Sequence, residues 1–168
     1  ETLLSLPHQL KAQLPLSTKL AQQIADQRQT IQNILEGKDH RLMIVTGPCS
    51  IHDPISALEY AQKLQQLQSQ VSDQIFLVMR AYIEKPRTTI GWKGFLYDPN
   101  LDNSSNMQLG LEKSRELYLQ IIEMGLPIAA EILSPMATAY FDDLLAWGAI
   151  GARTSESQIH REIASHMP

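Results

Sequence analysis

The amino-acid sequence predicts an α/β protein that begins with an arm and a helix and continues as the first half of a (β/α)8 TIM barrel. One observation is that four short apolar runs alternate with longer segments of helical periodicity after residue 37. Because crossovers of this kind are right-handed, the four strands are expected to be parallel, with the helices outside the sheet. A second observation is that a polar residue follows each strand, as at the carboxyl ends of barrel strands. The third is length, because eight such units need about 250 residues and this chain has 168.

Composition and charge narrow the class of protein. With 43% hydrophobic residues the chain can bury one sizeable core, and we divide it into an N-terminal arm and helix (1–37) and a partial barrel (38–168). No apolar run approaches the roughly 20 residues of a membrane span, and the N-terminus lacks the pattern of a signal peptide. Cys49 is the only cysteine, which suits a reducing compartment. The pI near 5.7 argues against nucleic acid as a partner. Together these observations predict a cytoplasmic protein without membrane partners.

The N-terminal region carries no residues that point to chemistry. Residues 1–16 consist of short apolar pieces broken by Pro7 and Pro15, which predicts an arm that docks on another surface. Ser17 is expected to cap a helix that Gly37 ends, with apolar residues at helical spacing between them. We expect this region to serve assembly or regulation.

The strands and helices of the barrel follow in order. Strands are predicted at residues 42–45, 75–79, 127–130 and 149–152. The first is fully apolar, as in a strand buried in a parallel sheet. Helices are predicted from Pro54, with Asp53 as N-cap, at 108–124, at 135–147, and from Ser155 or Ser157 to the chain end. Residues 91–105 form a polar stretch without clear periodicity that is too long for a plain connector.

A polar residue comes after each of the four predicted strands. These residues are Cys49, Arg80, Glu131 and Arg153. Since parallel strands end at the same edge of a sheet, four such residues are harder to explain by packing than one would be. We therefore expect them to converge on one site.

The segment after the second strand adds a local cluster of cations to this site. Arg80, Lys85 and Arg87 lie close together in a chain whose acidic residues outnumber its basic ones by 18 to 14. Guanidinium groups bind phosphate or carboxylate bidentately and ammonium adds a point charge, so the cluster predicts a site for a multiply charged anion. The alternative is a solvated loop whose charges are neutralised by neighbours such as Glu84. With Pro86 fixing the backbone, we favour the anion site.

Five motifs in one order carry a resemblance to a known family. They are Gly-Pro-Cys-Ser at 47–50, His-Asp-Pro at 52–54, Glu-Lys-Pro-Arg-Thr at 84–88, Gly-Trp-Lys-Gly at 91–94 and Gly-Ala-Ile-Gly-Ala-Arg-Thr at 148–154. The chain resembles the N-terminal half of a 3-deoxy-D-arabino-heptulosonate 7-phosphate (DAHP) synthase of the type inhibited by aromatic amino acids. The resemblance covers nearly the whole chain. It implies a (β/α)8 barrel that condenses phosphoenolpyruvate with erythrose 4-phosphate at a divalent metal, the first step of the shikimate pathway.

The resemblance also implies roles for individual residues. Cys49 is implied as the thiolate ligand of a divalent metal of the Mn, Fe, Co or Zn class, which would polarise the aldehyde. The alternative for Cys49 is a buried cysteine that packs as a small hydrophobe. Arg80 and Lys85 are implied as catalytic residues that hold phosphoenolpyruvate. The other implied substrate contacts are Pro86, Arg87 and Thr88 around the erythrose 4-phosphate phosphate, and Glu131, Ala152 and Arg153 at phosphoenolpyruvate.

The main departure from the family pattern is that most of the family's metal ligands are absent from these 168 residues. The other metal ligands of the family, a His, a Glu and an Asp, come from later strands, so we predict that these 168 residues alone are inactive. A half barrel leaves two strand edges open, which favours a homo-oligomer. The alternative function is a non-catalytic half barrel that binds phosphorylated ligands or an aromatic amino acid effector. A related phosphoenolpyruvate aldolase making another sugar acid is disfavoured by the full set of motifs.

Overall fold

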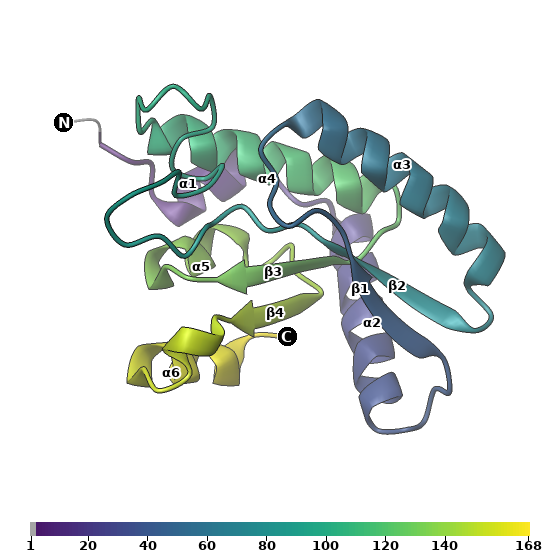
Figure 1. The fold of residues 1–168 in the computed structure, drawn as a ribbon. Coiled ribbons are helices and arrows are strands. Elements are labelled where there is room, and N and C mark those ends of the chain that lie inside the picture. The colour runs from purple at the N-terminus through teal and green to yellow at the C-terminus, as the bar shows by residue number, and fades with distance from the viewer. Residues whose placement is uncertain (1–2) are drawn as a thin grey trace.

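Four parallel strands form a single curled sheet (Figure 1) in the computed structural model, which describes residues 3–168. The strands are β1(Leu42–Thr46), β2(Ile75–Arg80), β3(Ile128–Ile132) and β4(Trp147–Ile150), and they are arranged in chain order. The register places Val45 opposite Val78, Arg80 opposite Ala129, and Glu131 opposite Ala149. The predicted half-barrel architecture is therefore confirmed.

In the described part of the chain six helices surround the sheet, and three of them begin at predicted capping residues. The helices are α1(Pro7–Gln13), α2(Thr18–Leu35), α3(Pro54–Val71), α4(Met107–Glu123), α5(Pro135–Phe141) and α6(Gln158–His166), with a short 3-10 turn η1(Ala152–Thr154) after β4. Ser17, Asp53 and Ser157 each accept a hydrogen bond from a backbone N–H of the first turn that follows. Among the described residues no helix has the length and apolar character needed to cross a membrane.

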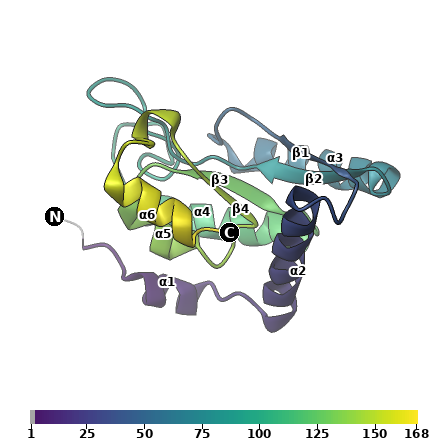
Figure 2. The ribbon, with the colours of Figure 1, turned by 90° about the horizontal axis from the view of Figure 1, so that it is seen from below.

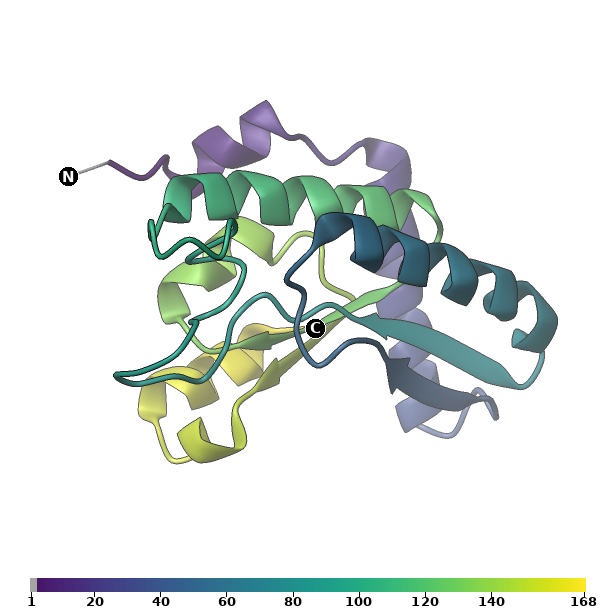
Figure 3. The same ribbon diagram turned by 45° about the horizontal axis from the view of Figure 1, so that its top comes forward.

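The two faces of the sheet pack against different helices. Alternate residues of β2, including Leu77 and Met79, belong to the large outer core that α3, α4 and α5 cover (Figure 3). The intervening residues Phe76 and Val78 face inward and pack with Ile31 of α2, near the beginning of the strands (Figure 2). At the other end of the strands, this inner face carries polar side chains.

The N-terminal segment contains a helix that the sequence analysis did not predict. Pro7, expected to break the arm, is instead the first residue of α1, where its missing N–H costs nothing. The segment docks on α4 and α5 of the same chain, because Tyr140 Oη donates to the Ser5 carbonyl (2.7 Å) and Ser5 N–H donates to Gln108 Oε1 (2.8 Å). Residues 1 and 2 of the predicted arm lie outside the described residues. A role in assembly or regulation stays a prediction.

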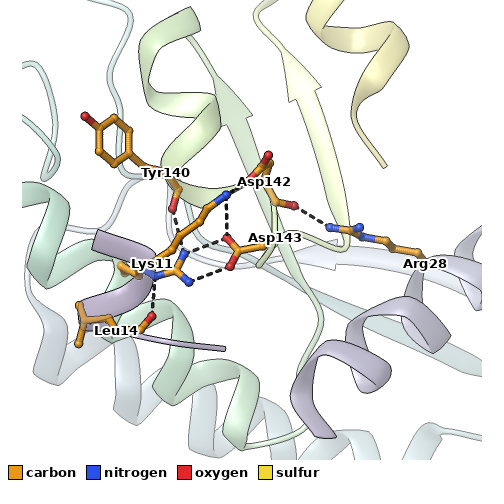
Figure 4. A network of polar contacts seen from close by, with 7 residues as sticks. Lys11, Leu14, Arg28, Tyr140, Asp142 and Asp143 are labelled. Atoms are coloured by element: carbon orange, nitrogen blue, oxygen red, sulfur yellow. Dashed lines mark hydrogen bonds and ion pairs between the residues drawn. The ribbon is translucent and has the colours of Figure 1, made fainter. Parts of the chain in front are cut away.

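A buried arginine fixes this segment to the barrel. Arg115 of α4 has no exposed surface, and it donates to the carbonyls of Leu14 (2.8 Å) and Tyr140 (3.0 Å). Its guanidinium also binds the Asp143 carboxylate bidentately, at 2.8 and 2.7 Å. Figure 4 shows how Lys11 and Arg28 approach the same turn from the N-terminal helices.

Several predicted boundaries and one predicted burial were wrong. β3 extends to Ile132, so Glu131, predicted to follow the third strand, lies within it. The helix from Pro135 ends at Phe141 instead of residue 147, because the Ala146 N–H already donates to the Ile128 carbonyl of the sheet (3.0 Å). The fourth strand consequently begins at Trp147. The first strand, predicted to be buried, leaves Leu42 63% and Val45 41% exposed. In the part of the chain that the structure describes, β1 pairs only with β2 and forms an edge of the sheet.

Candidate active site

Cys49 is brought beside the end of β2 by the loop that follows β1. The Ile51 N–H donates to the Tyr82 carbonyl (2.8 Å), so this loop runs along the segment after β2. Gly47 permits the approach, since a Cβ at this position would overlap the Arg80 carbonyl. Arg80 Nη2 then donates to the Cys49 carbonyl (3.1 Å). The thiol is exposed, which contradicts the alternative of a cysteine buried in packing.

The thiol of Cys49 lies in a cationic environment. Lys85 Nζ is 3.1 Å from Cys49 Sγ. The hydrogen bond and charge of Lys85, with smaller contributions from Arg80 and Arg87, lower the pKa of Cys49 below its ordinary value. The arrangement favours the thiolate, the form that binds metals and reacts as a nucleophile.

Arg80 and Glu131 project from neighbouring strands onto the inner face of the sheet. Arg80 follows Phe76 and Val78 at alternate positions of β2, and Glu131 follows Ala129 in the same way on β3. The Arg80 guanidinium stacks on the ring of Tyr82, 3.9 Å from its centroid. Arg80 Nε is buried and has no hydrogen-bond partner among the described residues. Arg80 thus carries a donor that no group of the described chain satisfies, beside a thiol and a second cation.

The loop that carries Lys85 and Arg87 is held by the returning segment 93–96. Lys85 N–H donates to the Lys93 carbonyl (2.9 Å), and Leu96 N–H donates to the Ile83 carbonyl (3.0 Å). Gly94 makes this close pairing possible, because it has φ of 112° and a Cβ there would overlap Ile83 and Glu84. The motif at 91–94 therefore positions the cationic loop.

Glu84 is buried, which differs from the alternative hypothesis of a solvated loop whose cations it neutralises. Only 4% of its surface is exposed, so it does not neutralise the loop cations from solvent. Its carboxylate accepts hydrogen bonds from Tyr97 Oη (2.9 Å) and from the N–H groups of Leu133 (3.1 Å) and Ser134 (3.2 Å). Burial raises the pKa of Glu84, and the three donors oppose that rise. The sequence offered no signal for this burial, because a glutamate directly before Lys85 is also typical of a solvated loop.

The cations line a pocket of about 420 Å³. A separate pocket of about 570 Å³ lies beside α2 and contains none of the predicted site residues. We call the pocket lined by the cations the cationic pocket; it is formed by Lys85, Pro86, Arg87, Thr88, Lys93 and Arg153, together with Glu84, Tyr97, Leu133, Ser134 and Thr154. Lys85 contacts Cys49 and also lines this pocket, so it joins the thiol to the cations. Lys93 and Thr154 were missed as site residues, although both belong to motifs visible in the sequence.

Arg153 lines this pocket, and the remaining predicted residues, Ala152 and Glu131, lie next to it. Arg153 and Ala152 occupy the exposed 3-10 turn that follows β4, instead of directly ending the strand. Glu131 is half-buried, and a Cβ on Gly151 would lie 3.5 Å from its Oε1, which places the carboxylate next to that turn. The predicted convergence on one end of the sheet is thus present in the geometry, and the individual roles stay predictions.

The described residues do not form a complete metal site. Within residues 3–168 there is no group of three His, Cys, Asp or Glu side chains that could hold an ion. Cys49 offers one thiol, whereas a transition-metal site in a protein needs three or four protein ligands. These residues alone therefore do not fit a bound divalent metal.

Comparisons with known proteins agree with the geometry. The family model described as DAHP synthetase I family matches residues 16–168. The chain is 54% identical over 165 residues to the Tyr-sensitive phospho-2-dehydro-3-deoxyheptonate aldolase of Escherichia coli (strain K12), covering 98% of this chain and 46% of that protein. The Phe-sensitive enzyme of the same strain is 50% identical over 159 residues, or 95% of this chain and 45% of that protein. The structure of the aldolase from Francisella tularensis SCHU S4 superimposes with a TM-score of 0.94 at 48% identity, over 98% of this chain and 48% of that one. The chain thus spans about half the length of these relatives.

Proposed function

Because this chain belongs to the DAHP synthetase I family, we propose that it forms the substrate-binding first half of a DAHP synthase. Such an enzyme joins phosphoenolpyruvate to erythrose 4-phosphate, consumes a water molecule, and releases DAHP and inorganic phosphate. The observation that carries the proposal is the cationic pocket at the carboxyl ends of the strands, with Arg80 and Cys49 beside it. Both substrates are phosphorylated, and cations that converge from separate loops suit two such anions.

Phosphoenolpyruvate would bind toward the sheet. Arg80 and Lys85 would hold its carboxylate, and the unsatisfied Arg80 Nε supports this role because it needs an acceptor. Arg153 and the N–H of Ala152 would hold its phosphate at the turn after β4. Glu131 would face the substrate through water and keep the neighbouring arginines in place.

Erythrose 4-phosphate would bind farther out along the loop. Arg87 and Thr88 line the cationic pocket and would hold its phosphate, with Pro86 fixing the backbone between Lys85 and Arg87. The cations offset the repulsion between two anionic substrates and hold the reacting carbons together. The methylene carbon of phosphoenolpyruvate would then form a bond to the aldehyde carbon, water would add at the phosphate-bearing carbon, and phosphate would leave.

We propose Cys49 as the one metal ligand that these residues supply. A divalent ion held by Cys49 together with further ligands would supply polarisation of the aldehyde oxygen. The remaining donors would come from outside the 168 residues, in keeping with the half-length match to the relatives. An aromatic amino acid is proposed as feedback inhibitor, since the relatives carry the names Tyr-sensitive and Phe-sensitive. A homo-oligomeric assembly is proposed because β1 forms an open edge of the sheet in the described residues.

Calorimetric titration of the chain with each substrate separately tests the binding roles. Arg87→Ala should weaken binding of erythrose 4-phosphate far more than binding of phosphoenolpyruvate, whereas Arg161→Ala, on the exposed surface of α6, should change neither. Equal losses for the two substrates would contradict the assignment of Arg87.

An activity assay separates the two candidate functions. The chain is mixed with both substrates and Mn²⁺, and release of inorganic phosphate is followed. We expect binding without turnover, because one thiol cannot complete a metal site. Product formation would show that the 168 residues are catalytic by themselves and would overturn the prediction of an inactive half. Absence of substrate binding would overturn the proposed function.

A further inference from the structure

The buried Glu84 lies in the wall of the cationic pocket, next to the cations proposed to bind substrate. Lys85 follows it in the chain and reaches Cys49, and Arg87 lies two residues beyond. Neither cation forms an ion pair with Glu84 among the described residues, since its oxygens are engaged by Tyr97, Leu133 and Ser134. Glu84 thus lines the cationic pocket, but its carboxylate is bound by these protein donors and not by the neighbouring cations.

The three donors come from two other parts of the fold. Tyr97 directly follows the returning segment 93–96, which pairs with residues 83–85. Leu133 and Ser134 form the turn between β3 and α5, and this turn is itself fixed because the Leu133 carbonyl accepts a hydrogen bond from His160 Nε2 (2.8 Å). Glu84 therefore connects the cationic loop to a turn that α6 holds in place.

Stability alone does not explain a charge at this position. A buried carboxylate loses its hydration, and an apolar side chain of similar size is often as stable or more stable at such a site. What the carboxylate provides is directionality, because three donors converge on two oxygens and define where the backbone at residue 84 must lie. The backbone position at residue 84 in turn determines where the side chains of Lys85 and Arg87 lie.

We infer that Glu84 is a positioning residue, whose buried carboxylate fixes the loop that presents Lys85 and Arg87 to substrate phosphate and carboxylate groups. The inference rests on the proposed function of the cationic pocket. It goes beyond that function because it assigns a role to a residue whose carboxylate is bound by the protein itself.

Glu84→Gln distinguishes positioning from electrostatics by the sign of its effect on anion affinity. If Glu84 acted only through its charge, removing a negative charge near the cations would strengthen phosphate binding. If it positions the loop, the new amide NH₂ must face at least one of the donors, and phosphate binding should weaken roughly tenfold. Glu59→Gln removes the same charge from the exposed surface of α3 and serves as the matched control.

Two measurements are made on each variant. Calorimetry with inorganic phosphate gives the affinity, and amide hydrogen exchange at Lys85, whose N–H donates to Lys93, reports the loop without any ligand. We expect faster exchange at Lys85 and weaker phosphate binding in Glu84→Gln, with no change in Glu59→Gln. Unchanged exchange together with equal or stronger binding would overturn the inference and leave the proposed function standing. If the unaltered chain binds no phosphate, the proposed function fails, and the exchange measurement alone decides whether Glu84 fixes the loop.

A second variant covers the case in which Glu84→Gln does not fold, as judged by circular dichroism. Tyr97→Phe keeps the carboxylate and both backbone donors and removes one hydrogen bond (2.9 Å). It should also speed exchange at Lys85, and it should weaken phosphate binding by a few-fold. Exchange at Lys85 identical to that of the unaltered chain would overturn the inference.

Discussion

At the scale of single residues, the contact between Lys85 and Cys49 determines the reactivity of the thiol. Lys85→Met removes the hydrogen bond and the positive charge that together lower the pKa of Cys49. The pKa should rise toward its ordinary value, and the smaller thiolate fraction should slow alkylation by iodoacetamide at pH 7 by roughly three- to tenfold. The pH dependence of the alkylation rate measures this directly. Lys63→Met, on the exposed face of α3, should leave the rate unchanged; a Lys85→Met rate equal to that of the control would contradict the assigned cause.

Substituting two glycines that both have positive φ distinguishes the cost of backbone strain from the cost of steric overlap. Gly94 has φ of 112° and lies against Ile83 and Glu84, whereas Gly125 has φ of 83° and nothing within 4 Å of a Cβ. Gly125→Ala should cost about 1 kcal/mol, the price of the left-handed backbone. Gly94→Ala adds overlap with the backbone and should cost about 3 kcal/mol.

Denaturant unfolding measures both free energies. The same Gly94→Ala variant should weaken phosphate binding, because the returning segment 93–96, which holds Lys85, must shift. Equal destabilisation by the two substitutions would mean that the loop relaxes freely around residue 94.

At the scale of elements, the Arg115 network decides how firmly the N-terminal segment is held. Asp143→Asn would leave a fully buried guanidinium without its counter-ion and should destabilise the chain by about 3 kcal/mol. The neighbouring Asp142 pairs with Lys11 at 2.6 Å on a half-exposed surface, so Asp142→Asn should cost less than about 1 kcal/mol. Thermal and denaturant unfolding compare the two, and limited proteolysis near Leu14 reports local release. A larger effect at Asp142 would contradict the assignment.

Sequence reasoning predicted the elements better than their ends. Apolar periodicity and capping residues were sufficient for α2 and α3, because their signals are local. The end of α5 depends on the hydrogen bond from Ala146 N–H to the Ile128 carbonyl, 18 positions away, and no local pattern reveals that pairing. The burial of Glu84 likewise depends on Leu133, 49 positions away. In the candidate site, residues at strand ends were predictable from topology, whereas Lys93 and Thr154 enter the cationic pocket through loop geometry.

At the scale of the whole molecule, an open half barrel explains the exposure of its first strand. Leu42 and Val45 are apolar, and β1 has a free edge in the described part of the chain. Such an edge offers unpaired N–H and C=O groups together with apolar side chains, which is the combination that promotes strand pairing between chains. In a longer polypeptide of the relatives' length, further strands could cover the same edge.

We therefore expect the isolated 168-residue chain to self-associate through β1. Its weight-average sedimentation coefficient should rise with protein concentration. Val45→Lys places a charge on the inner face beside the open edge, and the cost of desolvating that charge should weaken association by about tenfold. Leu67→Lys is the control, since Leu67 on α3 is 44% exposed, close to the 41% of Val45, but lies outside the sheet. A sedimentation coefficient that is independent of concentration would contradict self-association. Equal losses from the two lysines would place the contact elsewhere on the surface.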